Sequence, residues 1–262
     1  MATRRAPLLE LDRVRFSYDG RRVIDDLSFS VTQGETLALL GPSGCGKTTV
    51  LNLLAGFLLP DAGEVRIGGT RVTAPGPDRG VVFQSYALFD WMTVSENIAF
   101  ALRCAGRPLS EQRRVAAEMA ELVGLQGWER AYPYELSGGM KQRCCLARVL
   151  AARPRVMLMD EPFAAVDIQT RERLQEEILA IQEALGTTLV FVTHSIDEAI
   201  FLGHRILLFD PAGANAESTS VREFEVDLPA PRARAQIRLD PRFLDLRNEI
   251  YLAMHRPALH AS

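Results

Sequence analysis

A glycine-rich segment constrains the fold of this chain more than any other feature. Residues 39–49 run Leu-Leu-Gly-Pro-Ser-Gly-Cys-Gly-Lys-Thr-Thr, between an apolar stretch and the start of a helical pattern. Glycines at both ends followed by Lys and Ser/Thr are typical of a loop that binds nucleotide phosphates. The glycines allow a tight turn, and its backbone N–H groups form an anion site at the positive end of the next helix. The segment therefore predicts a strand, a loop and a helix within an α/β fold.

Three side chains of this loop have chemistry of their own. Lys47 supplies a point charge for the outer phosphates, and the Thr48 hydroxyl is a suitable ligand for Mg²⁺. Cys45 lies at the positive end of the expected helix, which should favour its thiolate. The alternative is a glycine-rich turn with a surface lysine. The apolar strand before the loop and the helix after it argue against that alternative.

The length and charge of the chain limit the remaining possibilities. Its 262 residues suffice for one α/β domain with a small subdomain or tail. The formal net charge of −3 gives no reason to expect a nucleic-acid surface, which is usually strongly basic. We find no apolar run long enough for a signal peptide or a membrane span, so we expect a cytosolic chain that reaches a membrane only through a partner. The four cysteines lack metal-site spacing, and we expect reduced thiols.

The amino-terminal part has the pattern of antiparallel strands. Residues 8–16 and 27–32 alternate between apolar and polar side chains, as half-buried strands do. The helix after the phosphate loop is expected to run from Thr48 to a stop at Gly56. Tyr18 follows the first strand. It is either a partly exposed aromatic residue at a strand end or a platform on which an adenine ring stacks.

The pattern becomes helical between residues 85 and 131. Thr93 and Glu96 form a capping-box pattern, and Ser110 is expected to cap a second helix. We interpret this region as a small helical subdomain. Its first segment, residues 86–92, carries several large apolar side chains. They are either subdomain core or an exposed contact for a partner.

Polar residues follow three predicted buried strands. Gln84 follows the first of them, Asp160 and Glu161 the second, and His194 the third. In a doubly wound sheet, ligands bind at the carboxyl ends of the strands. The two carboxylates are therefore suited to metal binding and general-base catalysis at that edge. A lone histidine is more often structural, but this one follows a strand that ends at the same edge.

A second segment has the composition of an anion site. Residues 136–143 run Leu-Ser-Gly-Gly-Met-Lys-Gln-Arg, and Ser137 is expected to cap a helix that begins there. The amino end of this helix would be a second place for phosphate to bind. Further on, Asp167 and Gly186 are expected to begin and end a long amphipathic helix.

Taken in order, these motifs resemble those of the ATP-binding subunit of an ABC transporter. The resemblance covers roughly residues 8–210 and rests most on the Ser-Gly-Gly segment that lies between the phosphate loop and the carboxylates. Within that family the chain is most similar to the ATPases of nitrate, sulfonate and taurine importers. The matching segments are residues 78–84, 91–97, 136–143, 197–200, 227–229 and 246–250. The chain departs from that group at Asp90, at Ser195 and in the Ala-Ala-Val-Asp run of residues 164–167.

The resemblance implies a domain organisation. We expect the P-loop NTPase fold of ABC ATPases, an α/β fold with an antiparallel β subdomain and an inserted α-helical subdomain. The ATPase domain is expected at residues 1–210, with the helical subdomain at about residues 85–155. Residues 211–262 are expected to form a short carboxyl-terminal extension of a strand, a linker and a helix.

The resemblance also implies roles for individual residues. Tyr18 would stack on adenine, Glu161 would orient and deprotonate the attacking water, and His194 would contact the γ-phosphate. Gln84 completes the expected catalytic set with Glu161 and His194. The residues expected to bind ATP are Tyr18, Gly41, Pro42, Ser43, Gly44, Cys45, Gly46, Lys47, Thr48 and Thr49 of one subunit, with Ser137, Gly138 and Gly139 of the other. The residues expected around Mg²⁺ are Thr48, Gln84 and Asp160.

The implied function is that of an ATP-hydrolysing motor. Two copies would close head-to-tail over two ATP molecules, as a homodimer attached to transmembrane permease subunits at the cytoplasmic face of the membrane. A periplasmic or extracellular solute-binding protein would be an indirect partner, and nucleic acid is not expected. The alternative is a non-transport ABC ATPase that acts mechanically on nucleic acid or the ribosome, but the long coiled-coil insertions or second cassette of that class are not seen. A soluble kinase or GTPase does not explain the Ser-Gly-Gly segment.

Overall fold

The structure is a computed structural model that describes residues 6–164, 166–209, 220–229 and 235–255. The chain divides into two compact units. The first, here the phosphate-loop unit, comprises the described residues of Met1–Gly76 and Thr188–Ser262. The second, the helical unit, comprises those of Pro77–Thr187. Among the helices of the described residues, none is both long and apolar enough to cross a membrane.

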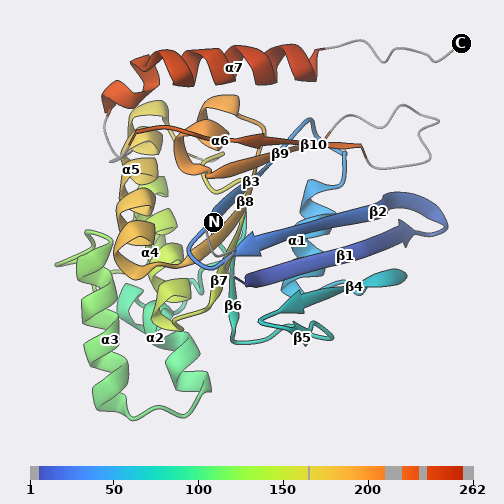
Figure 1. Ribbon diagram of the computed structural model, residues 1–262. Helices are drawn as coiled ribbons and strands as arrows, with labels where there is room; N and C mark the ends of the chain where they lie inside the picture. The colour runs from blue at the N-terminus through green and yellow to red at the C-terminus, as the bar shows by residue number, and fades with distance from the viewer. Residues whose placement is uncertain (1–5, 165, 210–219, 230–234, 256–262) are drawn as a thin grey trace, which may run out of the picture. The chain divides into compact units, whose positions relative to one another are not determined.

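An antiparallel sheet opens the phosphate-loop unit (Figure 1). Its strands are β1 (Pro7–Tyr18), β2 (Arg21–Thr32), β4 (Ala62–Ile67) and β5 (Thr70–Arg71), in the order β2-β1-β4-β5. The buried side chains of β1 include Leu9, Leu11, Val14 and Phe16, but Leu8 is buried as well, and the pairing with β2 shifts register between Leu11 and Val14. The alternation predicted from the sequence is therefore present only in part, because the irregular pairing interrupts it.

A second group of strands in this unit contains strands that are buried on both faces, with a more exposed strand at one edge. The strands are β3 (Thr36–Leu40), β8 (Thr188–Thr193), β9 (Arg205–Phe209) and β10 (Val221–Glu225), in the order β10-β9-β3-β8. Strand β3 lies parallel to both β8 and β9, and every residue of β3 and β8 is buried. Continuous burial of parallel strands explains their unbroken apolar sequence. Leu40 pairs with Thr193, so β3 and β8 end at the same edge.

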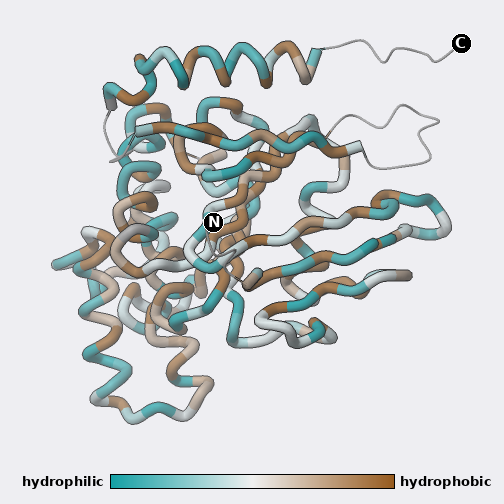
Figure 2. The backbone as a smooth tube through the Cα atoms, viewed as in Figure 1, coloured by the Kyte–Doolittle hydropathy of each residue, from teal (hydrophilic) through white to brown (hydrophobic). Residues whose placement is uncertain are grey.

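Helices complete the phosphate-loop unit. They are α1 (Lys47–Ala55), α6 (Ile196–Leu202), η2 (Ala235–Leu239) and α7 (Pro241–Met254). Helix α1 ends at Gly56, whose left-handed backbone confirms the predicted stop. Helix α7 packs on α6, with Phe243 and Ile250 buried, and Figure 2 shows hydrophilic and hydrophobic residues alternating along it. Arg247 of α7 pairs with Asp197 of α6 at 3.0 Å.

The helical unit contains one pair of strands among its described residues, β6 (Arg79–Val82) and β7 (Val156–Asp160), which are parallel. Its helices are α2 (Val94–Cys104), α3 (Leu109–Leu122), η1 (Pro133–Glu135), α4 (Gly138–Ala151) and α5 (Ile168–Leu185). Helix α4 packs against α2, α3 and α5. The predicted capping box of Thr93 and Glu96 is present at the start of α2.

The predicted cap at Ser110 is wrong. Helix α3 begins at Leu109, with Pro108 in the N-cap position and no side-chain cap. Ser110 is therefore the second residue of the helix. The backbone before α3 is extended at Pro108 (φ −55°, ψ 146°), and the fixed φ of proline sets the entry of the chain into the helix without a capping hydroxyl.

Candidate functional site

The phosphate loop joins β3 to α1, and its shape requires glycine. Gly41, Gly44 and Gly46 have φ values of 152°, 82° and 97°, which side chains disfavour. An added Cβ at Gly46 would lie 2.8 Å from the Cδ1 atom of Ile24, and one at Gly41 would lie 2.7 Å from a backbone oxygen. Backbone conformation and close packing therefore both exclude other residues at these two positions.

Lys47 is directed into this loop. Its side chain is buried, and Nζ donates to the carbonyl oxygens of Gly41 (2.7 Å) and Pro42 (2.6 Å). Gly46, the N-cap residue of α1, provides no side-chain cap. The loop thus presents a buried ammonium group and the amide groups of a helix start, the combination that binds phosphate.

The predicted thiolate character of Cys45 is wrong. Burial raises the pKa of this thiol, and the nearby charge of Lys47 lowers it by a smaller amount. The Sγ atom instead donates to the carbonyl oxygen of Pro42 at 3.1 Å. Cys45 is therefore a neutral thiol that closes the turn of the loop.

Tyr18 lies at the end of β1 and belongs to the same unit as the loop. Its ring is 46% exposed and meets Phe16 edge to face, with centroids 4.8 Å apart. Phe16 pairs with Ile24 of β2, and Ile24 packs closely on Gly46 of the loop. The hairpin that carries Tyr18 therefore contacts the phosphate loop.

His194 follows β8 and is exposed. Because Thr193 pairs with Leu40, His194 and the phosphate loop begin at the same edge. Ser195 caps α6 by accepting from the backbone N–H of Glu198 at 3.3 Å, and its own N–H donates to Thr193 Oγ1 at 3.0 Å. Serine is a good N-cap residue, so this departure from the resembled group leaves α6 capped.

In the helical unit, the ends of β6 and β7 bring two predicted residues together. Val82 pairs with Met159, and just beyond these strands Gln84 Nε2 donates to Glu161 Oε2 at 3.3 Å. Glu161 has a φ of 44°, a left-handed conformation that is uncommon for residues other than glycine and that often marks functional sites. Asp160 is the last residue of β7 and is partly buried.

The Ser-Gly-Gly segment begins α4 as predicted. Ser137 Oγ accepts from the backbone N–H of Met140 at 3.3 Å, which is an N-cap contact. Gly139 faces α5, because a Cβ at this position would lie 2.5 Å from the Cγ2 atom of Thr170. The backbone N–H of Thr170 donates in turn to Asp167 Oδ1 at 3.0 Å, so the capped starts of the two helices are packed together.

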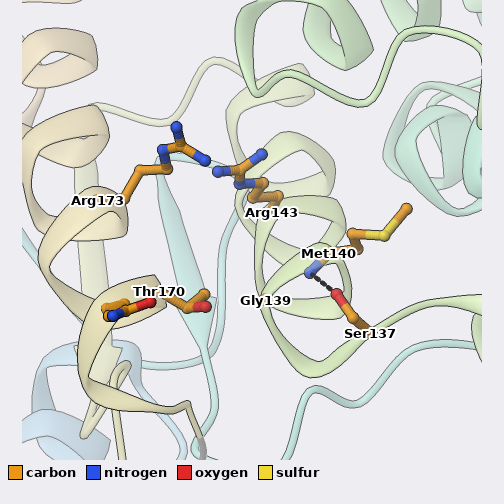
Figure 3. Close-up of a pocket in the computed structure, with 7 residues that line it drawn as sticks. Ser137, Gly139, Met140, Arg143, Thr170 and Arg173 are labelled. Carbon is orange, nitrogen blue, oxygen red and sulfur yellow. Dashed lines mark hydrogen bonds between the residues drawn. The ribbon is translucent and has the colours of Figure 1, made fainter.

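A cavity of about 420 Å³ lies between these helix starts (Figure 3). It is lined by Ser137, Gly139, Met140 and Arg143 from the α4 side and by Gln169, Thr170 and Arg173 of α5. The sequence predicted the two helix starts but not this cavity. Which residues of α5 face α4 depends on how the two helices pack. The predicted cap at Asp167 does not indicate this packing.

The 86–92 loop has both buried and exposed apolar side chains. Met92 is buried, whereas Trp91 is 73% exposed. Asn97, fully buried in α2, binds the loop backbone: its Nδ2 donates to the carbonyl oxygens of Phe89 (3.1 Å) and Met92 (3.0 Å), and its Oδ1 accepts from the N–H of Phe89 (2.9 Å). One side chain thus holds the loop in a single shape.

Helix α4 holds the other end of this loop. Arg148 donates to the carbonyl oxygen of Ala87 at 2.7 Å and lies over the ring of Phe89, 5.5 Å from its centroid. The Sγ atom of Cys145 donates to the carbonyl oxygen of Tyr86 at 2.6 Å. Ala87 itself has a positive φ of 48°, so these contacts fix a strained turn. The sequence indicated the loop but none of these anchors.

The structure thus groups the predicted residues by unit. Tyr18, the phosphate loop and His194 belong to the phosphate-loop unit. Gln84, Asp160, Glu161 and the Ser-Gly-Gly segment belong to the helical unit. Each group has a defined local geometry.

Known proteins resemble most of the chain. The family described as ABC transporter matches residues 24–164. The nitrate import ATP-binding protein NrtD of Synechococcus elongatus is 44% identical over 90% of this chain and 86% of its own length. The taurine import ATP-binding protein TauB of Chromobacterium violaceum is 43% identical over 92% of this chain and 94% of its own length. A solved dimeric structure of the ATP-binding cassette MJ0796, in a post-hydrolysis state bound to ADP and Pi, is 28% identical with a TM-score of 0.70 and covers 84% of this chain and 99% of its own.

Proposed function

The chain belongs to the ABC transporter family as one of its ATPases, and we propose that it powers the import of a small solute such as nitrate, a sulfonate or taurine. The observation that carries this proposal is the similarity to import ATPases along nearly the full length of both chains. The local geometry of the site supports ATP hydrolysis as the source of energy.

The phosphate loop is proposed to hold the ATP phosphates. Its glycine-dependent backbone and the buried Lys47 ammonium suit a polyanion. Residues 41–49 would surround the phosphates, and the partly exposed ring of Tyr18 would stack on the adenine. In the family resemblance, His194 would contact the γ-phosphate from the strand next to β3.

The donor chemistry of three side chains fits Mg²⁺. Thr48, Gln84 and Asp160 offer a hydroxyl, an amide and a carboxylate oxygen, which are the hard ligands that this ion prefers. Gln84 Nε2 donates to Glu161, which leaves the Oε1 atom of Gln84 as the atom that would bind Mg²⁺. When bound, Mg²⁺ would neutralise charge on the phosphate oxygens.

Glu161 is proposed as the general base. Its carboxylate accepts from Gln84 at 3.3 Å, and its left-handed backbone (φ 44°) directs the chain sharply after β7. A carboxylate held in this way can orient a water molecule and take its proton as the water attacks the γ-phosphate. The neighbouring Asp160 would serve the metal ion instead.

The functional unit is proposed to be a head-to-tail homodimer. Two separate helix starts with anion-binding chemistry occur in one chain, at Gly46 and at Ser137. In the family resemblance, the Ser137–Gly139 segment of one copy completes the ATP site of the other. A related cassette forms a dimer with ADP and Pi, which supports this arrangement.

Membrane permease subunits are the proposed partners, contacted by the 86–92 loop at the cytoplasmic face. This loop is rigidly anchored by Asn97 and Arg148 and yet exposes Trp91. A large apolar side chain on a rigid, exposed loop is suited to a protein interface. A solute-binding protein outside the membrane would take part only through the permease.

The proposed function is tested by identifying the partner and then measuring transport. A photoreactive residue in place of Trp91 should cross-link the chain to an integral membrane protein in cells. The purified complex, reconstituted in vesicles with its solute-binding protein, should take up nitrate, taurine or an alkanesulfonate only with Mg·ATP, and Lys47→Ala should abolish uptake. Cross-linking to ribosomes or nucleic acid, or ATP hydrolysis without uptake of any of these solutes, would contradict the proposal.

A further inference from the structure

The cavity between α4 and α5 has charged walls that the proposed function does not use. Two guanidinium groups line it, those of Arg143 and Arg173, and its lining residues include no carboxylate. Figure 3 shows the two guanidinium groups pointing toward one another across the gap between the helices. Two cations that face one cavity repel each other unless an anion lies near both.

One protein carboxylate partly compensates these two cations. Arg143 pairs with Glu177 at 2.6 Å, and the charges of both Arg143 and Arg173 act on this same carboxylate. Burial nevertheless raises the pKa of Glu177, and the nearby Glu176 raises it further. The carboxylate of Glu177 therefore balances only part of the positive charge of the two arginines that line the cavity.

The size and lining of the cavity indicate the class of ligand. Its volume of about 420 Å³ accommodates an oxyanion together with several waters, because a water molecule occupies about 30 Å³ in the liquid. Its lining side chains include no aromatic ring, so a nucleobase would have no stacking surface. The planar fork of arginine matches the oxygens of a phosphate group, and the amide of Gln169 adds a neutral donor at the wall.

These arginines are distinct from the Ser-Gly-Gly segment. Arg143 follows Gly139 by four residues on α4, and Arg173 follows Thr170 by three residues on α5. Each arginine is therefore about one helical turn, or about 5 Å, further along its helix than the contact between Gly139 and Thr170. A ligand between the guanidinium groups would lie beyond the helix starts.

We propose that this cavity is a binding subsite for one phosphate group, held by Arg143 and Arg173. The part played by these two arginines goes beyond the proposed function, which assigns phosphate contacts at this helix start to residues 137–139 alone. The phosphate group has two sources, the free phosphate that hydrolysis produces and a phosphate of the nucleotide that a second copy carries. The second source rests on the proposed head-to-tail dimer, whereas the first does not.

Direct titration tests the subsite without ATP hydrolysis. In full-length protein carrying Lys47→Ala, which weakens competition by the phosphate loop, inorganic phosphate is titrated calorimetrically at constant ionic strength. Arg173→Gln should weaken phosphate binding about tenfold, because a charge-assisted contact is lost. Glu177→Gln should strengthen it, because a competing carboxylate is neutralised. Arg113→Gln, which removes an exposed arginine of α3, should leave it unchanged, and Arg173→Lys should restore part of the affinity.

The opposite effects expected for Arg173→Gln and Glu177→Gln separate a binding role from a structural one. Equal losses in Arg113→Gln and Arg173→Gln, or weaker binding in Glu177→Gln, would overturn the proposal. The second arm uses Glu161→Gln with Mg·ATP and follows dimer formation by light scattering. If adding Arg173→Gln to Glu161→Gln raises the ATP concentration needed for dimer formation, the nucleotide is the source of the phosphate group. If dimer formation is unchanged but binding of inorganic phosphate is weaker, free phosphate is the source. No effect of Arg173→Gln in either arm would contradict the subsite itself.

Discussion

The phosphate loop and the 86–92 loop differ in how their shapes are specified. The phosphate loop is determined by its own sequence, because Gly41 and Gly46 are the residues that fit and Lys47 binds the loop's own carbonyl oxygens. The 86–92 loop is determined by residues outside it, chiefly Asn97 and Arg148. Substitution of Lys47 in the first loop should therefore affect mainly nucleotide binding, and substitutions at the anchors outside the second loop should remove its shape.

The largest expected effect concerns the phosphate loop. Lys47→Ala should lower ATP affinity about a hundredfold, because a charged group that contacts phosphate is worth more than a neutral hydrogen bond. Equilibrium binding of a fluorescent ATP analogue measures the loss. Partner capture through Trp91 should remain as in the wild-type protein. Loss of partner capture together with ATP binding would show that the two loops are not independent.

Removing the anchor of the 86–92 loop should have a smaller effect, on stability. Asn97→Ala leaves buried backbone groups of the loop without their partners, and each such group costs about 1 kcal/mol or more. We expect the free energy of unfolding to fall by about 2–4 kcal/mol. The unfolding transition of the helical unit in urea measures this change. A change below about 0.5 kcal/mol, the range of surface substitutions, would show that Asn97 does not hold the loop.

Trp91→Ala should separate docking from folding. Because this side chain is 73% exposed, its loss should change the free energy of unfolding by no more than about 0.5 kcal/mol. Permease association and transport should fall while basal ATP hydrolysis survives. Trp128→Ala is the matched control, since Trp128 is an exposed tryptophan of the same unit. If both substitutions weaken permease association equally, Trp91 has no special part in docking.

Thiol reactivity tests the corrected state of Cys45. Burial raises the pKa of Cys45, and it raises those of Cys144 and Cys145 to about 12, so little thiolate is present in any of them at pH 7. Iodoacetamide should modify the exposed Cys104 first. The modification of Cys45 should accelerate as the pH rises toward its raised pKa, and ATP should slow it. Peptide mass spectrometry measures each rate, and faster labelling of Cys45 than of Cys104 at pH 7 would support the thiolate instead.

Features with local causes were predictable from the sequence. The helix stop at Gly56 and the caps at Thr93, Ser137 and Asp167 depend on residues within a few positions, and the structure confirms them. The approach of Gln84 to Glu161 followed from the rule that parallel strands end at one edge. The roles assigned to these site residues stay predictions.

Features with distant causes were not predictable. Arg148 binds Ala87 from 61 positions away, and Thr170 packs on Gly139 from another helix. The pKa of Cys45 depends on burial by surrounding chain, which the helix start alone did not indicate. Tertiary packing decided each of these cases. Ser110 is different, because the N-cap position is occupied by Pro108, only two residues before it.

The two carboxylates after β7, Asp160 and Glu161, should have different effects on binding of Mg·ATP. Asp160→Asn should weaken Mg·ATP binding, because it removes a charge that is proposed to face the metal ion. Glu161→Gln should leave ATP binding intact. Titration of each variant with Mg·ATP and with ATP in the presence of a chelator distinguishes them. Equal loss of Mg·ATP affinity in both variants would contradict separate roles for these two neighbours.

Glu161 is proposed to be the base of an ATPase that works as a head-to-tail dimer. Light scattering of Glu161→Gln with saturating Mg·ATP, beside phosphate release, tests this claim. General-base removal typically costs 10²- to 10⁴-fold in rate, so phosphate release should fall by about that factor. The protein should then accumulate as a dimer stabilised by bound ATP. A monomer at saturating ATP, or release at the wild-type rate, would contradict the claim.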